Sequence, residues 1–199
     1  MSMDENMLPK AYAQKFQMAQ YNAPPLSFPL VVKTFRRYFN SSPEEMFDSF
    51  TQKAVNAASI GQVHQAKLNG KKLAVKIQYP GVADSVSSDL KLAKPIAMRI
   101  MNIKGKDLNH YLKEVEERLL EETDYELELK RSVDLTEKCS HLKNTVFPKY
   151  YAEFSSKRVI TMDWIEGQHL TDWLKTNPSQ EMRNNIGQAM WDFYDFQIH

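Results

Sequence analysis

Cysteine, glycine and long apolar runs are all scarce in this sequence. The single cysteine, Cys139, excludes an internal disulfide and fits a reducing compartment. No run of about 18 consecutive apolar residues occurs, so no segment is predicted to span a membrane. The first residues are acidic and lack the apolar core of a signal peptide. Lys and Arg number 26 against 25 Asp and Glu, and this lack of a basic excess argues against nucleic-acid binding.

Apolar residues are nevertheless plentiful. They make up 42% of the 199 residues, which is enough for one sizeable core or two small ones. We therefore expect a globular intracellular protein, either cytoplasmic or attached peripherally to a membrane.

Apolar periodicity predicts several helices. Residues 9–20 are predicted as an amphipathic helix, and a second helix follows the proline-rich segment 22–29. Ser42-Pro43-Glu44-Glu45 has the pattern of a capping box at a helix N-terminus. Further helices are predicted over 87–102, over 106–138 with a bend near Thr123, over 170–175 and over 179–199.

Strands are predicted on both sides of Asn69-Gly70, a dipeptide that is the strongest short-range signal for a hairpin. Two more strand candidates, 145–154 and 157–165, are joined by Ser155-Ser156. Helices that alternate with hairpins indicate an α+β fold, in which helices pack against a small antiparallel sheet.

One predicted strand carries a lysine among apolar residues. Leu73, Val75 and Ile77 share the face that we assign to the core, whereas Ala74 and Lys76 share the other face. A lysine is costly to bury unless it is paired. Lys76 is therefore either an exposed cation on a half-solvated strand or a residue that binds nucleotide phosphates, with Ala74 leaving room for a flat base.

The spacing before Val63 favours the nucleotide interpretation. The pattern Asn56-x-Ala58-x-x-Gly61-x-Val63 has the register of the protein-kinase loop G-x-G-x-x-G-x-V, and "LAVK" stands where kinases have V-A-I-K. The residues predicted to cover a nucleotide are Ala57, Ala58, Ser59, Ile60, Gly61, Gln62 and Val63.

Three stretches carry a more specific resemblance. "AASIGQVHQA", "AVKIQYPGV" and "EETDYELELKRS" resemble the alanine-rich loop, the strand lysine and the E-x-D helix of the AarF/UbiB family of atypical protein-kinase-like proteins. The resemblance covers nearly the whole chain. It implies a protein-kinase-like N-lobe, ATP or ADP with magnesium as cofactors, and a role in ubiquinone or other isoprenoid-lipid metabolism. The implied partners are the nucleotide and, beyond it, an isoprenoid or quinone lipid or lipid-synthesis proteins.

The resemblance also implies roles for individual residues. Lys76 is expected to contact the α- and β-phosphates, and Glu128 to orient it. Glu122 and Asp124 match the E-x-D pair, which in the family faces a K-x-G-Q motif on the N-terminal extension. Four-residue spacing predicts a buried helical stripe, bordered by Glu128, of Tyr125, Leu129 and Val133.

A second stretch, "VITMDWIEGQHL", resembles the strand and hinge between kinase lobes. Met162 is expected at the back of the adenine pocket. Asp163, Trp164 and Ile165 are expected to offer backbone hydrogen bonds to the base, although Trp164 fits plain packing equally well. The histidines lack metal-ligand spacing, so no metal site is assigned to them.

The loop also departs from the glycine-rich form. Glycine populates positive φ freely and leaves its amides open to phosphate. Our hypothesis is that Asn56 and Ala58, which stand in for two glycines, hold a nucleotide in a geometry poor for protein phosphorylation.

Several family motifs are missing from the chain. A K-x-G-Q motif is expected before residue 1, and an H-x-D loop, an asparagine and a D-F-G aspartate that hold magnesium are expected after residue 199. We therefore expect a fragment that does not catalyse phosphoryl transfer, and we assign no catalytic residue within it. Its expected parts are a helical extension (1–49), an N-lobe (50–166) with a helical insertion at about 83–138, and the start of a second lobe (167–199).

Three functions remain open on the sequence alone. The chain is either the nucleotide-binding portion of a kinase-like ATPase, a non-catalytic nucleotide- or lipid-binding regulator, or a helical interaction protein in which Lys76 is incidental. The last helix would need cover from a missing lobe for its apolar residues Ile186, Met190, Phe193 and Ile198.

Overall fold

The fold is built around a small antiparallel sheet. The computed structural model describes residues 26–101 and 105–198, so the helix predicted over 9–20 lies outside the described residues. The sheet has the order β1-β3-β4-β5, and β2 pairs separately with β3. Its strands are β1 (Ser49–Phe50), β2 (Asn56–Ala58), β3 (Gly61–Leu68), β4 (Lys71–Gln78) and β5 (Val159–Asp163).

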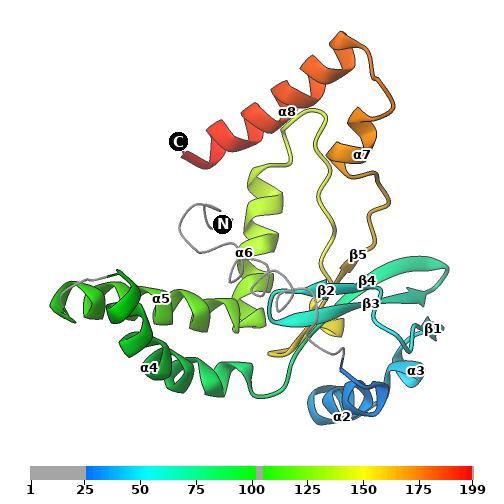
Figure 1. The fold of residues 1–199 in the computed structure, drawn as a ribbon. Helices are drawn as coiled ribbons and strands as arrows, with labels where there is room; N and C mark the ends of the chain where they lie inside the picture. Colours follow the sequence, from blue (N-terminus) through cyan, green and yellow to red (C-terminus); the bar gives the residue numbers. More distant parts are fainter. Residues whose placement is uncertain (1–25, 102–104, 199) are drawn as a thin grey trace.

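Helices surround the sheet, and the described residues therefore form the α+β arrangement that the sequence predicts. In Figure 1, α4 and α5 form an arm on one side of the sheet, while α7 and α8 lie at the far end of the molecule from α2. The helices are α2 (Phe28–Phe39), α3 (Pro43–Met46), α4 (Val82–Met101), α5 (Gly105–Glu122), α6 (Tyr125–Lys138), α7 (Leu170–Leu174) and α8 (Gln180–Ile198), with a short 3₁₀ helix at Ala152–Phe154.

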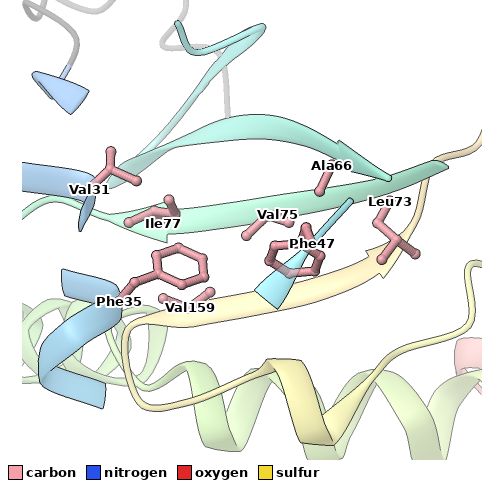
Figure 2. Close-up of a cluster of buried hydrophobic side chains, with 8 residues drawn as sticks. All are labelled: Val31, Phe35, Phe47, Ala66, Leu73, Val75, Ile77 and Val159. Carbon is pink, nitrogen blue, oxygen red and sulfur yellow. The ribbon is translucent and has the colours of Figure 1, made fainter. Parts of the chain in front are cut away.

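The main core lies between α2 and one face of the sheet. Val31 and Phe35 of α2 are fully buried, and Figure 2 shows them beside the buried strand residues. The cluster is completed by Phe47, Ala66, Leu73, Val75, Ile77 and Val159. Burial of each large apolar side chain contributes roughly 1.5–3 kcal/mol. The segment from residue 26 to 49, which we assigned to an extension, thus shares its core with the sheet.

The hairpin at Asn69-Gly70 confirms the prediction from the sequence. Asn69 has φ 51° and Gly70 has φ 76°, as a two-residue turn between twisted strands requires, and Leu68 pairs with Lys71 across it. The capping box at α3 is also present, because Glu45 accepts a hydrogen bond from the backbone N–H of Ser42 at 2.7 Å.

The bend expected near Thr123 is a complete break between two helices. α5 ends at Glu122, and α6 begins at Tyr125 after Asp124, whose side chain accepts a hydrogen bond from the N–H of Leu127 at 3.1 Å. Asp124 is therefore the N-cap of α6.

Two expectations about secondary structure are wrong. The segment 145–154 forms only an isolated bridge, between Tyr150 and Met162, before the 3₁₀ helix. Two N–H groups that a ladder would use are bound by side chains instead: that of Lys149 donates to Asp163 Oδ2, and that of Thr161 donates to Ser155 Oγ. The predicted buried stripe also ends early: Tyr125 is fully buried, but Val133 is 37% exposed because α6 runs away from the sheet toward α8 (Figure 1).

Candidate functional site

Lys76 is paired with Glu128, which is the contact that the family resemblance implies. The ammonium of Lys76 donates to the Oε1 and Oε2 atoms of Glu128 at 2.9 and 3.1 Å. The two side chains are 20% and 33% exposed, so the pair is accessible from solvent. A lysine held in this way is fixed in one direction.

The aromatic ring of Tyr125 packs against the ammonium group of Lys76. The Lys76 ammonium lies 4.7 Å from the ring centre, within the range of a cation–π contact. Burial first, and then the nearby carboxylate of Glu128, raise the pKa of Tyr125 well above its ordinary value, so the phenol is neutral. Among the described residues its hydroxyl has no hydrogen-bond partner.

A polar anchor fixes the start of α6 on the sheet. The side-chain amide of Gln78 donates to the carbonyl of Thr123 at 3.0 Å, and Arg158 Nη1 donates to the same carbonyl at 3.1 Å. Arg158 also donates to Gln78 Oε1. Thr123 directly precedes the N-cap of α6, so these bonds position the helix that carries Glu128. The sequence analysis missed this anchor, although Gln78 is a polar residue two positions after Lys76 on the same strand face.

The alanine-rich segment is a strand with a short turn. Ala57 and Ala58 belong to β2, and only Ser59 and Ile60 form the turn to β3. The carbonyl of Ile60 accepts a hydrogen bond from the N–H of Tyr79 at 2.9 Å. This bond ties the tip of the turn to the end of the lysine-bearing strand.

Gly61 is required by the close approach of β4. A Cβ atom at this position would lie 2.3 Å from the carbonyl oxygen of Ile77, closer than non-bonded atoms come. Glycine is therefore required here because the paired strands leave no space for a side chain.

Predicted nucleotide contacts gather on the lysine face of the sheet. The register pairs Val63 with Lys76 and Ala74 with Met162, and directly paired residues share a face. Alternation along β4 places Ala74 and Lys76 on the same face. Because all four are half-buried, they form a partly open surface beside the ion pair.

The side chain of Gln62 faces the opposite way. Its Oε1 accepts from the N–H of Leu26 at 2.6 Å, and its amide nitrogen lies 2.7 Å from His64 Nε2. Any contact between Gln62 and a nucleotide on the lysine face would therefore have to come from its backbone.

Two backbone N–H groups of the expected hinge donate hydrogen bonds within the protein. The N–H of Asp163 donates to Lys149 O at 2.9 Å, and the N–H of Trp164 donates to Lys72 O at 3.2 Å. The carboxylate of Asp163 binds Lys71 at 2.7 Å. Two of the backbone donors expected for a base are thus occupied, which leaves the carbonyls of Asp163 and Trp164 and the backbone of Ile165 as the candidates.

A cavity of about 480 Å³ adjoins the ion pair. Within it, the carboxylate of Glu121 is bound by Arg131 at 3.0 Å and by Arg118 at 3.3 Å, and these contacts, with Arg131 the stronger, lower its pKa. Glu122 of the E-x-D pair lines the cavity, whereas Asp124 serves as the helix cap. The lining consists of Ser59, Ile60, Lys76, Arg118, Glu121, Glu122, Glu128, Arg131, Ser132 and Leu135.

The side chains of the described residues do not form a magnesium site. Over residues 26–101 and 105–198, no three His, Cys, Asp or Glu side chains converge as metal ligands would. In the same ranges, no helix combines the length and apolar character needed to cross a membrane.

Comparisons with known proteins decide the family. The model of the ABC1 atypical kinase-like domain matches residues 18–199. This chain belongs to the ABC1 family. An ABC1 family protein of Schizosaccharomyces pombe is 33% identical over 99% of the chain, and the atypical kinase coq-8, mitochondrial, of Caenorhabditis elegans is 31% identical over 83%. The chain spans 38% and 22% of these two relatives.

A solved structure supports the same fold. The Mycobacterium tuberculosis protein Rv3197, determined as a complex with erythromycin, matches with a TM-score of 0.66 and 29% identity. The match covers 92% of this chain and 47% of that one. The sheet and its helices are therefore a kinase-like N-lobe of the ABC1 type.

Proposed function

We propose that this chain is the nucleotide-binding part of an ABC1-type kinase or ATPase. The observation that carries the proposal is the Lys76–Glu128 pair, half-exposed beside a cavity and next to an open surface of small and apolar residues. In kinases, the equivalent lysine–glutamate pair must be in place for the lysine to hold the nucleotide phosphates.

Each part of the site has a role in this proposal. Lys76 binds the α- and β-phosphates, and the turn at Ser59 and Ile60 covers them from one side. The base lies against Ala74 and Met162, which are paired across β4 and β5. The carbonyl of Asp163 and the backbone of Ile165 supply its hydrogen bonds.

The described residues do not form a magnesium site. Because they offer no cluster of metal ligands, no step through the metal is assigned to them. The proposal for this chain is confined to nucleotide binding, and phosphoryl transfer is proposed only for a longer protein of the relatives' length.

The metabolic role of the whole protein is a further proposal. The AarF/UbiB resemblance implies ubiquinone or other isoprenoid-lipid metabolism, and one matching relative is named an atypical kinase, coq-8, mitochondrial. We propose that this protein acts in the metabolism of the same lipid class, at an intracellular site.

Thermal unfolding with nucleotide tests the proposal. ADP and ATP, each with magnesium, should raise the melting temperature of the wild-type chain, because a ligand at about 100 times its Kd stabilises the folded state by about 2.7 kcal/mol. Lys76→Met should abolish the rise. Lys72→Met is the matched control, since Lys72 is an exposed lysine of the same strand paired with Glu166. An equal rise in wild type and Lys76→Met, or none in wild type, would refute the proposal.

A further inference from the structure

A second cavity of about 480 Å³ lies between α2, the turn after β4 and the residues before β5. It shares no lining residue with the cavity beside Lys76. Its volume lies in the usual range for small-molecule sites, roughly 300–1,000 Å³. Neither the family resemblance nor the proposed nucleotide site assigns it a role.

The lining of this cavity is strongly basic. Lys33 and Arg37 come from α2, and Lys157 and Arg158 come from the approach to β5, whereas Asp84 is the one carboxylate that faces them. No ion pair within residues 26–101 and 105–198 neutralises any of the four cations. In a chain with 26 basic and 25 acidic residues, such a local excess of positive charge indicates a site for an anion.

Arg158 is held ready for such a ligand. Its Nη1 atom donates to Gln78 Oε1 and to Thr123 O, which fixes the guanidinium half-buried in the cavity wall. A guanidinium carries five N–H donors, so those on Nη2 and Nε are left over. A fixed guanidinium with spare donors suits the oxygens of a phosphate group, because little side-chain entropy is lost on binding.

Part of the lining is apolar. Leu30, Tyr38 and Pro80 contribute to it, so the cavity offers a surface for an organic group next to the four cations. We propose that this cavity binds a phosphate group carried by an organic molecule, either a soluble phosphate ester or the headgroup of a lipid. The site is independent of the nucleotide proposed at Lys76.

Calorimetric titration of the whole chain with pyrophosphate tests the proposal. Replacing Arg37 and Lys157 together by Gln should raise the Kd by about tenfold or more, since two charge-assisted hydrogen bonds are lost. Arg36→Gln is the matched control, because Arg36 precedes Arg37 on α2 and does not line the cavity. All titrations are made on the Lys76→Met background, because pyrophosphate would otherwise also bind at the proposed nucleotide site.

Flotation with vesicles distinguishes the two sources of the phosphate. Phosphatidylcholine vesicles with and without phosphatidic acid, whose headgroup is a phosphate monoester, are mixed with wild type and with the double variant. Binding that requires phosphatidic acid, is lost in the double variant and is displaced by pyrophosphate identifies a lipid headgroup. Binding of pyrophosphate without vesicle binding identifies a soluble ester. The proposal is overturned if neither probe binds wild type, or if the double variant binds both as wild type does.

Discussion

Lys76 and Glu128 are 52 positions apart, yet the lysine ammonium contacts both oxygens of the glutamate carboxylate, at 2.9 and 3.1 Å. One residue comes from β4 and the other from the first turn of α6. The contact therefore aligns a helix with a strand and leaves the lysine directed along the half-open face of the sheet.

Glu128→Gln should weaken nucleotide binding with little loss of stability. The pair is partly exposed, so its loss should lower the free energy of unfolding by no more than about 1 kcal/mol. The affinity for ADP should fall by roughly tenfold, because the lysine loses the charge that orients it. Calorimetry with ADP and urea unfolding measure the two effects. Glu126→Gln, at an exposed position of the same helix, is the control, and an unchanged affinity in Glu128→Gln would contradict the assigned role.

Gly61→Ala should destabilise the sheet strongly. The added methyl group would lie 2.3 Å from the carbonyl oxygen of Ile77, so β3 and β4 must separate. We expect the free energy of unfolding to fall by about 2–4 kcal/mol, measured by urea unfolding. Gly187→Ala is the control: nothing lies within 4 Å of its new Cβ atom in α8, and helix propensity should raise stability by about 0.5–1 kcal/mol. Equal stability of the two variants would argue against this account of Gly61.

His64 should make stability depend on pH. Burial lowers the pKa of this histidine below its ordinary value of 6.5, against a smaller opposing effect of its bond to Thr51. The unfolded chain then binds a proton at a higher pH than the folded chain does. Stability should therefore be full above about pH 6.5 and should decline as the pH falls toward the folded-state pKa.

Urea midpoints at about pH 7.5 and about pH 5.5 measure this dependence. His64→Gln should show a smaller decline between the two pH values than wild type. His110→Gln, at an exposed position of α5, should keep the decline of the wild type. A His64→Gln variant with the full wild-type decline would assign the effect to other groups.

Arg158→Met should affect both stability and nucleotide binding. The change removes the bonds to Thr123 O and Gln78 Oε1, and leaves both acceptors without this partner. We expect a loss of about 2 kcal/mol in the free energy of unfolding and a weaker affinity for ADP, because α6 is less firmly placed. Lys175→Met, which removes an exposed ion pair with Asp172 away from the cavity beside Lys76, is the control. If the two variants lose the same stability and affinity, the anchor has no special role.

Much of the fold could be predicted because local signals and tertiary structure agree. Asn69-Gly70 fixed the central hairpin, and the side-chain alternation of β4 placed Leu73 in the core and Lys76 on the other face. The segment 145–154 was misjudged because its β-forming residues suggested a full strand, whereas the side chains of Asp163 and Ser155 bind N–H groups that a longer ladder would need. Val133 was misjudged because periodicity does not reveal where a helix leaves the surface on which it packs.

The site was predictable only where the sequence carried a spacing pattern or a family resemblance. The partnership of Lys76 and Glu128 came from the resemblance, and its geometry is present in the structure. Gln62 could not be oriented from the sequence, since its face depends on the register that β2 and β4 impose on β3. The contacts of Arg158 were also hidden, because its partners lie 35 and 80 positions away.

The bonds from Gln78 and Arg158 to Thr123 O have a consequence for how such a lobe could be switched. They hold the base of α6 independently of the ion pair, so two separate sets of contacts place Glu128 beside Lys76. A regulatory movement of α6 away from the sheet would have to break these bonds as well as the Lys76–Glu128 ion pair. Under the proposed function, control is therefore expected to act on the turn at Ser59 and Ile60, which would cover the nucleotide, rather than on the tilt of the helix.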